Sequence, residues 1–215
     1  EILELFYEAG TYHRDEEGVK NTSIADLDKR LVDKYLMEVF HKKASDFGLP
    51  FEALMRNMQI TTLDGRLTLA GLLYFGNMPQ MFCPEMVVKA VSFYGNNIGS
   101  VNYRDSRDID GTIPRLFSEG MSFLKSNLHA LQDGQNFNSV GHLEISEIAL
   151  EEVLQNALVH RDYLKPAAVR LLIFDNRVEI ISPGKLPGGM DVDDIKLGNS
   201  FIRNRLMASF CAKTM

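Results

Sequence analysis

The order of the predicted elements indicates an α+β fold. Helical periodicity dominates roughly the first sixty residues, and strand-like and helix-like segments alternate after them. Two apolar, branched segments at 167–174 and 177–181 are separated only by Asp175-Asn176, which is good turn chemistry for a hairpin. Because hairpins replace regular strand–helix–strand repeats, we expect one mixed sheet covered on one side by helices.

The chain divides into two predicted parts, a helical N-terminal segment at 1–62 and an α/β domain at 63–215. In the first part, a capping-box pair at Ser23 and Asp26 opens a helix that runs to about residue 43. A glycine and a proline then predict a turn, and a second short helix follows over 51–58.

The second part contains most of the predicted strands. Its expected elements are a buried helix at 67–75, strands at 86–94 and 101–109, a long amphipathic helix at 114–131, a strand at 137–145, a helix at 146–160, the hairpin at 167–181, and helical segments starting at 191 and spanning 201–211.

The helix at 146–160 carries two polar residues one turn apart, Glu152 and Asn156. Ser146 is a good N-cap, and we expect Ala149, Leu150, Val153, Leu154, Ala157 and Leu158 to form the buried face. A carboxylate can take a proton from water, and an amide oxygen can bind a hard cation such as Mg²⁺. The alternative is an ordinary amphipathic helix with a solvated polar face, as most surface helices have.

The segment after the hairpin is rich in glycine and proline. Ser182 opens it, and Gly184, Gly188 and Gly189 allow positive φ values and a close approach of the backbone to a ligand. The alternative is a plain connector, which is the usual role of such clusters.

Three runs of the sequence together resemble the RecG-like transcriptional regulators. They are EEVLQNALVHRDY at 151–163, IFDNRVEIISPGKLPGGM at 173–190 and FIRN at 201–204, supported by DGRLTLAGLLYFGNMPQMFCP at 64–84. In that family an AlbA/Schlafen-type domain precedes this region. The region itself is a divergent GHKL domain, the Bergerat fold of ATP-binding proteins such as gyrase and MutL.

The resemblance implies a role for each candidate residue. Glu152 matches the residue that polarises the attacking water in family members that hydrolyse ATP. Asn156 matches the residue that holds Mg²⁺ against the phosphates, and Gly184 matches the first glycine of the D-x-G box. The Asp of that box, which reads the adenine amino group, is Ser182 here, and no later glycine-rich lid is present. The resemblance therefore implies a C-terminally truncated chain that is at most a weak ATPase.

His160 and Arg161, followed by Asp162, resemble a charged catalytic triplet. A structural role is the alternative that we favour. A protonated His160 and Arg161 would complement the negative end of the helix, and Asp162 would pair with Arg161 or Arg170.

Composition excludes several classes of protein. The chain has 215 residues, 45% of them hydrophobic, and a net charge of −6. No apolar run reaches the length of about 18 residues that a membrane span needs. Two cysteines without ligand spacing, and a start without a basic signal region, indicate a reduced cytoplasmic protein. The acidic charge and the lack of a basic cluster disfavour DNA binding by this segment itself.

Two functional hypotheses remain open. The first is an ATP-binding regulatory module of a bacterial transcriptional regulator, with ATP and Mg²⁺ between the 146–160 helix and the 182–189 loop. DNA would then be bound through domains outside this chain. The second is a GHKL-like fold without a ligand that serves as a dimerisation or interaction platform, for example in a homodimer.

Overall fold

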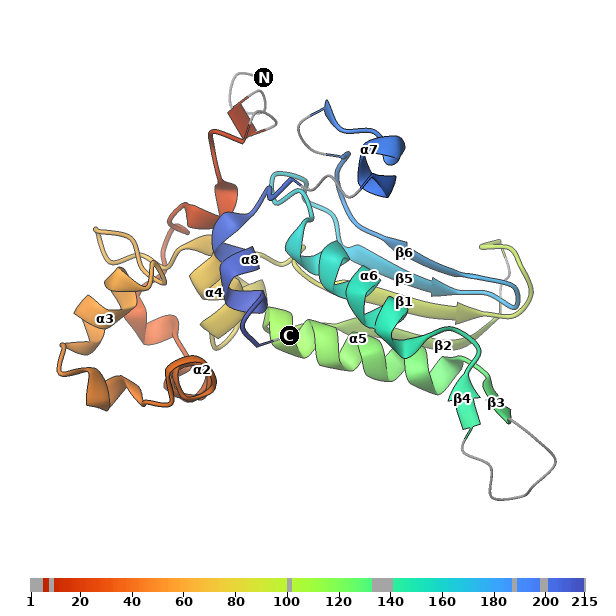
Figure 1. The fold of residues 1–215 in the computed structure, drawn as a ribbon, viewed down its shortest axis with the longest axis horizontal. Helices are drawn as coiled ribbons and strands as arrows, with labels where there is room; N and C mark the ends of the chain where they lie inside the picture. The colour runs from red at the N-terminus through yellow and green to blue at the C-terminus, as the bar shows by residue number, and fades with distance from the viewer. Residues whose placement is uncertain are drawn as a thin grey trace.

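The computed structural model describes residues 6–7, 10–99, 102–132, 141–186, 189–197 and 201–214. Within them a four-stranded sheet, ordered β2-β1-β5-β6, packs against helices, with further helices at one end (Figure 1). Strands β1 and β5 run parallel, whereas the β1–β2 and β5–β6 pairs are antiparallel. The predicted α+β class with a mixed sheet is therefore confirmed.

The helical first part agrees with the prediction, except that its first long helix begins later. The capping box at Ser23 and Asp26 is present, but it closes only the short turn η2, Ile24–Asp26. Helix α2, Lys29–Phe40, begins later because the Asp28 carboxylate accepts the backbone N–H of Arg30. The remaining elements are η1 Arg14–Glu16, η3 Ala44–Phe47, α3 Phe51–Asn57, α4 Leu69–Phe75 and η4 Pro79–Met81.

Helix α4 is buried along its whole length, as its uniformly apolar sequence predicts. Thr68 caps its N-terminus by accepting the backbone N–H of Gly71 at 3.0 Å. An aromatic cluster joins this helix to distant parts of the chain, since Phe75 lies 5.3 Å from Tyr35 of α2 and 5.2 Å from Phe210 of α8, between ring centroids. One hydrophobic core thus includes residues from Val19 to Cys211. The division at residue 62 stays a prediction.

The sheet is built from β1 Val88–Phe93, β2 Tyr103–Ile109, β5 Val169–Ile173 and β6 Val178–Ile181. Helices α5, Ile113–Asn127, and α6, Glu147–Val159, lie side by side over one face of it (Figure 1). Gly120 permits this close packing, because a Cβ there would lie 3.0 Å from Leu154 of α6 and 3.4 Å from Leu171 of β5. The predicted hairpin thus pairs as expected and lies under α6.

Several sequence-based boundaries are wrong. Helix α5 ends at Asn127, although the helix was predicted to continue to residue 131. Strand β3, Ala130–Gln132, follows instead and pairs with β4, Gly141–Leu143. Ser146 precedes α6, but its side chain makes no capping hydrogen bond. Residues 201–204 are not helical, so α8 spans only Arg205–Cys211. The segment after the hairpin holds the five-residue helix α7, Val192–Lys196.

Candidate functional site

The two polar residues singled out on α6 both lie on its exposed side. Leu150, Leu154 and Leu158 are buried, whereas Glu152 and Asn156 are exposed. Within the part of the chain that the structure describes, neither polar side chain has a hydrogen-bond or ion-pair partner. Both are thus free to meet a ligand or solvent, as the sequence predicted.

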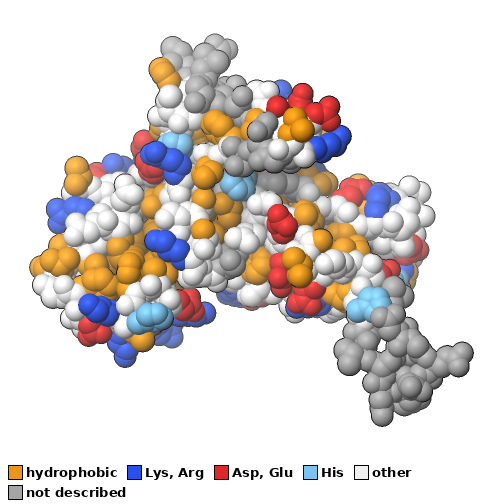
Figure 2. All heavy atoms as spheres, in the orientation of Figure 1, with side chains coloured by type: hydrophobic (Ala, Val, Ile, Leu, Met, Phe, Trp, Pro, Cys, Tyr) orange, Lys and Arg blue, Asp and Glu red, His pale blue; other side chains and the backbone are white. Residues whose placement is uncertain are grey.

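The apolar face of α6 is narrower than the periodicity predicts. Ala149 and Val153 were expected in the core, yet both are exposed, with Val153 at 50% and its neighbour Ile148 at 76%. Acidic and hydrophobic side chains consequently alternate on the surface over α6 (Figure 2). The helix therefore presents a mixed surface around Glu152 and Asn156.

The glycine-rich loop lies against the C-terminal half of α6. The Ser182 hydroxyl donates to the carbonyl oxygen of Ala157 at 2.7 Å, which places the start of the loop one residue beyond Asn156 along the helix. Gly184 has φ +118, and a Cβ there would lie 2.6 Å from the Asp162 Cβ, so the position requires glycine. Gly189 has φ +73 with open space around it, and Gly188 lies outside the described residues.

The charged residues in the turn after α6 have structural roles, but they do not complement the helix dipole as expected. Burial, helped by the Arg203 charge, lowers the pKa of His160, so this C-cap histidine is neutral near pH 7 and does not complement the helix dipole. The buried Arg161 guanidinium donates to the Ala167 carbonyl oxygen at 2.6 Å, and burial lowers its pKa. The prediction of a charged helix cap is therefore wrong for His160, and the Arg161 guanidinium binds a carbonyl oxygen beyond the helix instead of the helix end.

Asp162 also differs from its expected role. Its Oδ1 accepts the backbone N–H of Leu164 at 2.9 Å, and its own backbone N–H donates to the Pro183 carbonyl oxygen at 2.8 Å. No ion pair joins Asp162 to Arg161 or Arg170 among the described residues. The residue thus ties the turn to the glycine-rich loop.

Two residues that the sequence analysis left without a role, Arg203 and Asn204, hold this region together. The Arg203 guanidinium donates from Nη1 to the His160 carbonyl oxygen at 3.2 Å and from Nη2 to that of Lys185 at 2.6 Å. It thereby bridges the turn and the loop. The FIRN run, which carried part of the resemblance, was the signal for both residues.

Asn204 is fully buried and cross-links the end of α6. Its Nδ2 donates to the carbonyl oxygens of Val159 at 2.8 Å and Arg161 at 2.9 Å, and its Oδ1 accepts the Tyr7 hydroxyl at 3.2 Å. These bonds satisfy carbonyl groups that a helix end leaves without a partner.

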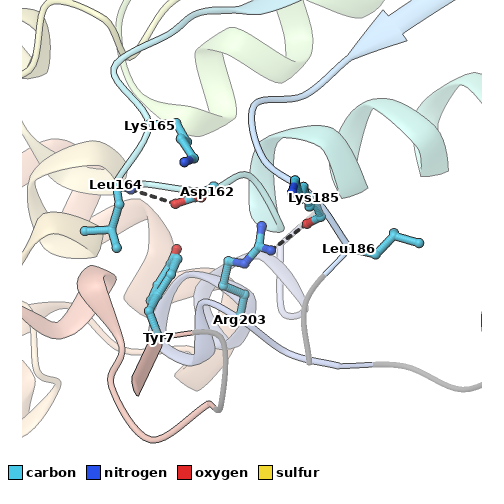
Figure 3. Close-up of a pocket in the computed structure, with 7 residues that line it drawn as sticks. All are labelled: Tyr7, Asp162, Leu164, Lys165, Lys185, Leu186 and Arg203. Atoms are coloured by element: carbon cyan, nitrogen blue, oxygen red, sulfur yellow. Dashed lines mark hydrogen bonds between the residues drawn. The ribbon is translucent and has the colours of Figure 1, made fainter. Parts of the chain in front are cut away.

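A cavity of about 160 Å³ lies between the turn, the loop and the N-terminal segment (Figure 3). Its walls combine one carboxylate, three cationic side chains, two leucines and an aromatic ring. The lining residues are Tyr7, Asp162, Leu164, Lys165, Lys185, Leu186 and Arg203. With charged groups of both signs beside two leucines and a ring, the cavity offers a hydrogen-bond acceptor, donors and apolar contacts to a small group.

The side chains of this region could contribute a ligand to Mg²⁺, but they do not form a metal site made of protein ligands alone. No group of three or more His, Cys, Asp or Glu side chains that could hold a metal exists among the described residues. Mg²⁺ is commonly bound through one or two protein oxygens together with phosphates and water. The exposed, unpartnered Asn156 amide fits that limited role.

Two parts of the chain are similar to known protein families. Residues 167–215 match the family model described as "Putative ATP-dependent DNA helicase recG C-terminal". Residues 4–86 match a domain of unknown function (DUF8451). No protein in the curated collection matches the chain.

The fold is shared with a solved structure. The crystal structure of the DIP2311 protein from Corynebacterium diphtheriae superposes with a TM-score of 0.67 at 15% sequence identity. The match covers 97% of this chain and 41% of that one, so this chain spans less than half of that protein's length.

The fold and the family matches together define a class rather than a particular protein. The chain is an α+β protein whose C-terminal part is similar to a RecG-related, ATPase-type domain. That match includes Ser182, the loop glycines and Arg203, but it begins after Glu152 and Asn156. No helix among the described residues is long and apolar enough to cross a membrane.

Proposed function

We propose that this chain is the ATP-binding regulatory module of a bacterial transcriptional regulator, with ATP and Mg²⁺ held between α6 and the 182–189 loop. One observation carries the proposal: Glu152 and Asn156 are exposed, with no partner among the described residues, on the helix against which Ser182 of the family-matched loop packs. Water satisfies exposed polar groups, so this pair is available to a ligand without any cost to the fold.

Each residue has a definite task in this proposal. The Asn156 amide oxygen contributes to Mg²⁺ binding, and the Glu152 carboxylate orients and deprotonates water near the phosphates. Gly184 lets the loop backbone come close to the turn after α6, and Gly189 offers a left-handed position open to solvent. Magnesium would neutralise phosphate charge when bound. Turnover is slow, because an open site leaves water around the phosphates.

The regulatory context is also part of the proposal. The net charge of −6 supports DNA binding through domains outside this chain rather than through this one. Cys83 and Cys211 are buried free thiols, which supports a reduced, cytoplasmic setting.

Calorimetric titration of ATP and ADP with Mg²⁺ tests the nucleotide site. We expect binding to this chain, and about tenfold weaker binding in Asn156→Ala, the effect of one contact of about 1.4 kcal/mol. Asn57→Ala is the matched control, since Asn57 is an exposed asparagine on another helix, α3. A folded protein that binds no nucleotide contradicts the proposal.

A second function, a dimerisation or interaction platform without nucleotide, is favoured by a separate observation. Ile148 and Val153 expose 76% and 50% of their surface on α6, and Leu186 of the loop exposes 42%. Sedimentation of the wild type and of Ile148→Glu would test a homodimer through this surface. A concentration-dependent dimer that the substitution dissociates, together with no nucleotide binding, would replace the first proposal with this one.

A further inference from the structure

We infer that the cavity at the end of α6 receives the base of the bound nucleotide, and that Asp162 selects a purine with a 6-amino group. The inference rests on the proposed nucleotide site and specifies how that site distinguishes its ligand. It assigns a specificity-determining role to a residue that the sequence alone indicated only as part of a helix cap.

The position of the cavity suits the base of a nucleotide whose phosphates lie at Asn156. Helix α6 ends at Val159, and Asp162 follows Asn156 by six residues. The last turn of the helix separates Asn156 from His160 by about 6 Å along the axis, which is within the span of a nucleotide. The volume of about 160 Å³ corresponds to about five water molecules. It holds one heterocyclic base but not a whole nucleotide.

The loop lacks a carboxylate of its own, and the structure brings one to it from elsewhere in the chain. Position 182 is serine, and its hydroxyl hydrogen is committed to the Ala157 carbonyl oxygen. Asp162 instead lies directly against the loop, because its backbone N–H is bound to Pro183 and its Cβ occupies the space beside Gly184. A charged acceptor binds an amino group about twice as strongly as a neutral one.

The Asp162 carboxylate is held in a fixed orientation, and its hydrogen bond to Leu164 uses only part of its capacity to accept hydrogen bonds. Asp162 is 8% exposed, and Oδ1 takes the Leu164 N–H at 2.9 Å, which holds the carboxylate in place while it lines the cavity. Leu164 and Leu186 line the same cavity and provide apolar contacts for a ring. A preorganised acceptor of this kind costs little to order when the ligand binds.

Cationic hydrogen-bond donors line the same cavity as the Asp162 carboxylate. Asp162, Arg203 and Lys185 all line the cavity (Figure 3). Arg203 is 5% exposed and is held by its bonds to the carbonyl oxygens of His160 and Lys185. The 6-amino edge of a purine carries a donor beside a ring-nitrogen acceptor, which matches a carboxylate beside cationic donors. A 6-oxo purine would direct an acceptor at the carboxylate, and sites that bind an N–H reject analogues without it.

The test compares ATP with ITP, in which an oxo group replaces the 6-amino group and N1 carries a hydrogen. We expect the wild type to bind ATP at least about tenfold more tightly, the equivalent of one hydrogen bond to a charged acceptor. Asp162→Asn keeps an acceptor for Leu164 and adds an amide donor for an oxo group, so the ratio should fall to within about threefold. Ser182→Ala should leave the ratio unchanged. Asp15→Asn is the matched control, since Asp15 is a buried carboxylate outside the cavity lining.

The possible results distinguish this inference from the proposed nucleotide site on which it rests. Loss of discrimination in Asp162→Asn, with a melting temperature like that of the wild type, supports it. ATP binding that weakens in Asn156→Ala, together with discrimination that Asp162→Asn preserves and Ser182→Ala removes, overturns the inference and leaves the nucleotide site standing. If Asp162→Asn fails to fold, Asp162→Glu replaces it, and an unchanged ATP-to-ITP ratio in that variant overturns the inference, because the longer side chain moves the acceptor. Absence of binding by any nucleotide overturns both.

Discussion

The middle and the end of α6 use their polar side chains in opposite ways. In the middle, Glu152 and Asn156 are exposed and have no partner within the described part of the chain. At the end, Arg161 and Asp162 are buried and hydrogen-bonded, and Asn204 is inserted beneath them. Buried polar groups must be satisfied by the fold, whereas exposed ones need not be.

The polar residues of α6 and of the turn after it therefore fall into two groups with different roles. The residues around His160 maintain the shape of the turn, and their loss should cost stability. The Glu152–Asn156 pair adds nothing to the packing, and its loss should affect only a ligand.

The largest expected effect is that of Asn204→Ala. The substitution removes the donor that binds the carbonyl oxygens of Val159 and Arg161 in a fully buried position. It also removes the acceptor of the Tyr7 hydroxyl, which still accepts the backbone N–H of Tyr163. We expect a loss of about 3 kcal/mol in the free energy of unfolding, or roughly 6–12 °C in Tm. Asn156→Ala should change stability by no more than about 0.5 kcal/mol. Equal losses in urea denaturation would remove the distinction between the two regions.

An intermediate effect is expected at the loop. Gly184→Ala combines φ +118 with a Cβ 2.6 Å from that of Asp162, whereas Gly189→Ala at φ +73 meets open space. We expect destabilisation of about 2–3 kcal/mol at Gly184 and about 1 kcal/mol at Gly189. Thermal unfolding of both variants measures the difference. A Gly184→Ala protein as stable as Gly189→Ala would show that the loop is not held against the turn.

The smallest effect concerns pH. Because burial lowers the folded-state pKa of His160 below its usual value of about 6.5, the unfolded chain binds the proton more readily. Stability from this group is therefore fully present above about pH 6.5 and is lost as pH falls below it. Chemical denaturation at pH 7.5 and 5.5 should show a smaller loss in His160→Gln than in the wild type. An identical pH dependence in both would show that His160 is not buried as a neutral group.

Local pattern was sufficient for most elements of the fold. The hairpin, the buried α4 and the long α5 follow from apolar periodicity and turn residues that act over a few positions. The errors have tertiary causes. Strand β3 exists because Ala130–Gln132 pairs with Gly141–Leu143, and residues 201–204 leave the helical conformation where Arg203 and Asn204 bond to carbonyl groups more than 40 residues earlier.

The candidate site was predictable to a similar extent. The spacing of Glu152 and Asn156 on one helix already placed them on an exposed face, and Gly184 proved to need its glycine. The roles of His160 and Arg161 were predicted from the helix dipole, which assumes exposed charge. Burial reversed that assumption, since desolvation disfavours a protonated histidine.

The sequence by itself therefore determined the α+β class, the hairpin, and the exposed polar pair on α6, because each depends on periodicity within one segment. Only the tertiary structure decided that Asp162 lies against Gly184, that Arg203 joins the turn to the loop, and that Tyr7 closes the cavity beside them. These contacts join residues up to nearly 200 positions apart, and no local pattern specifies which buried carbonyl or carboxylate a distant side chain will meet.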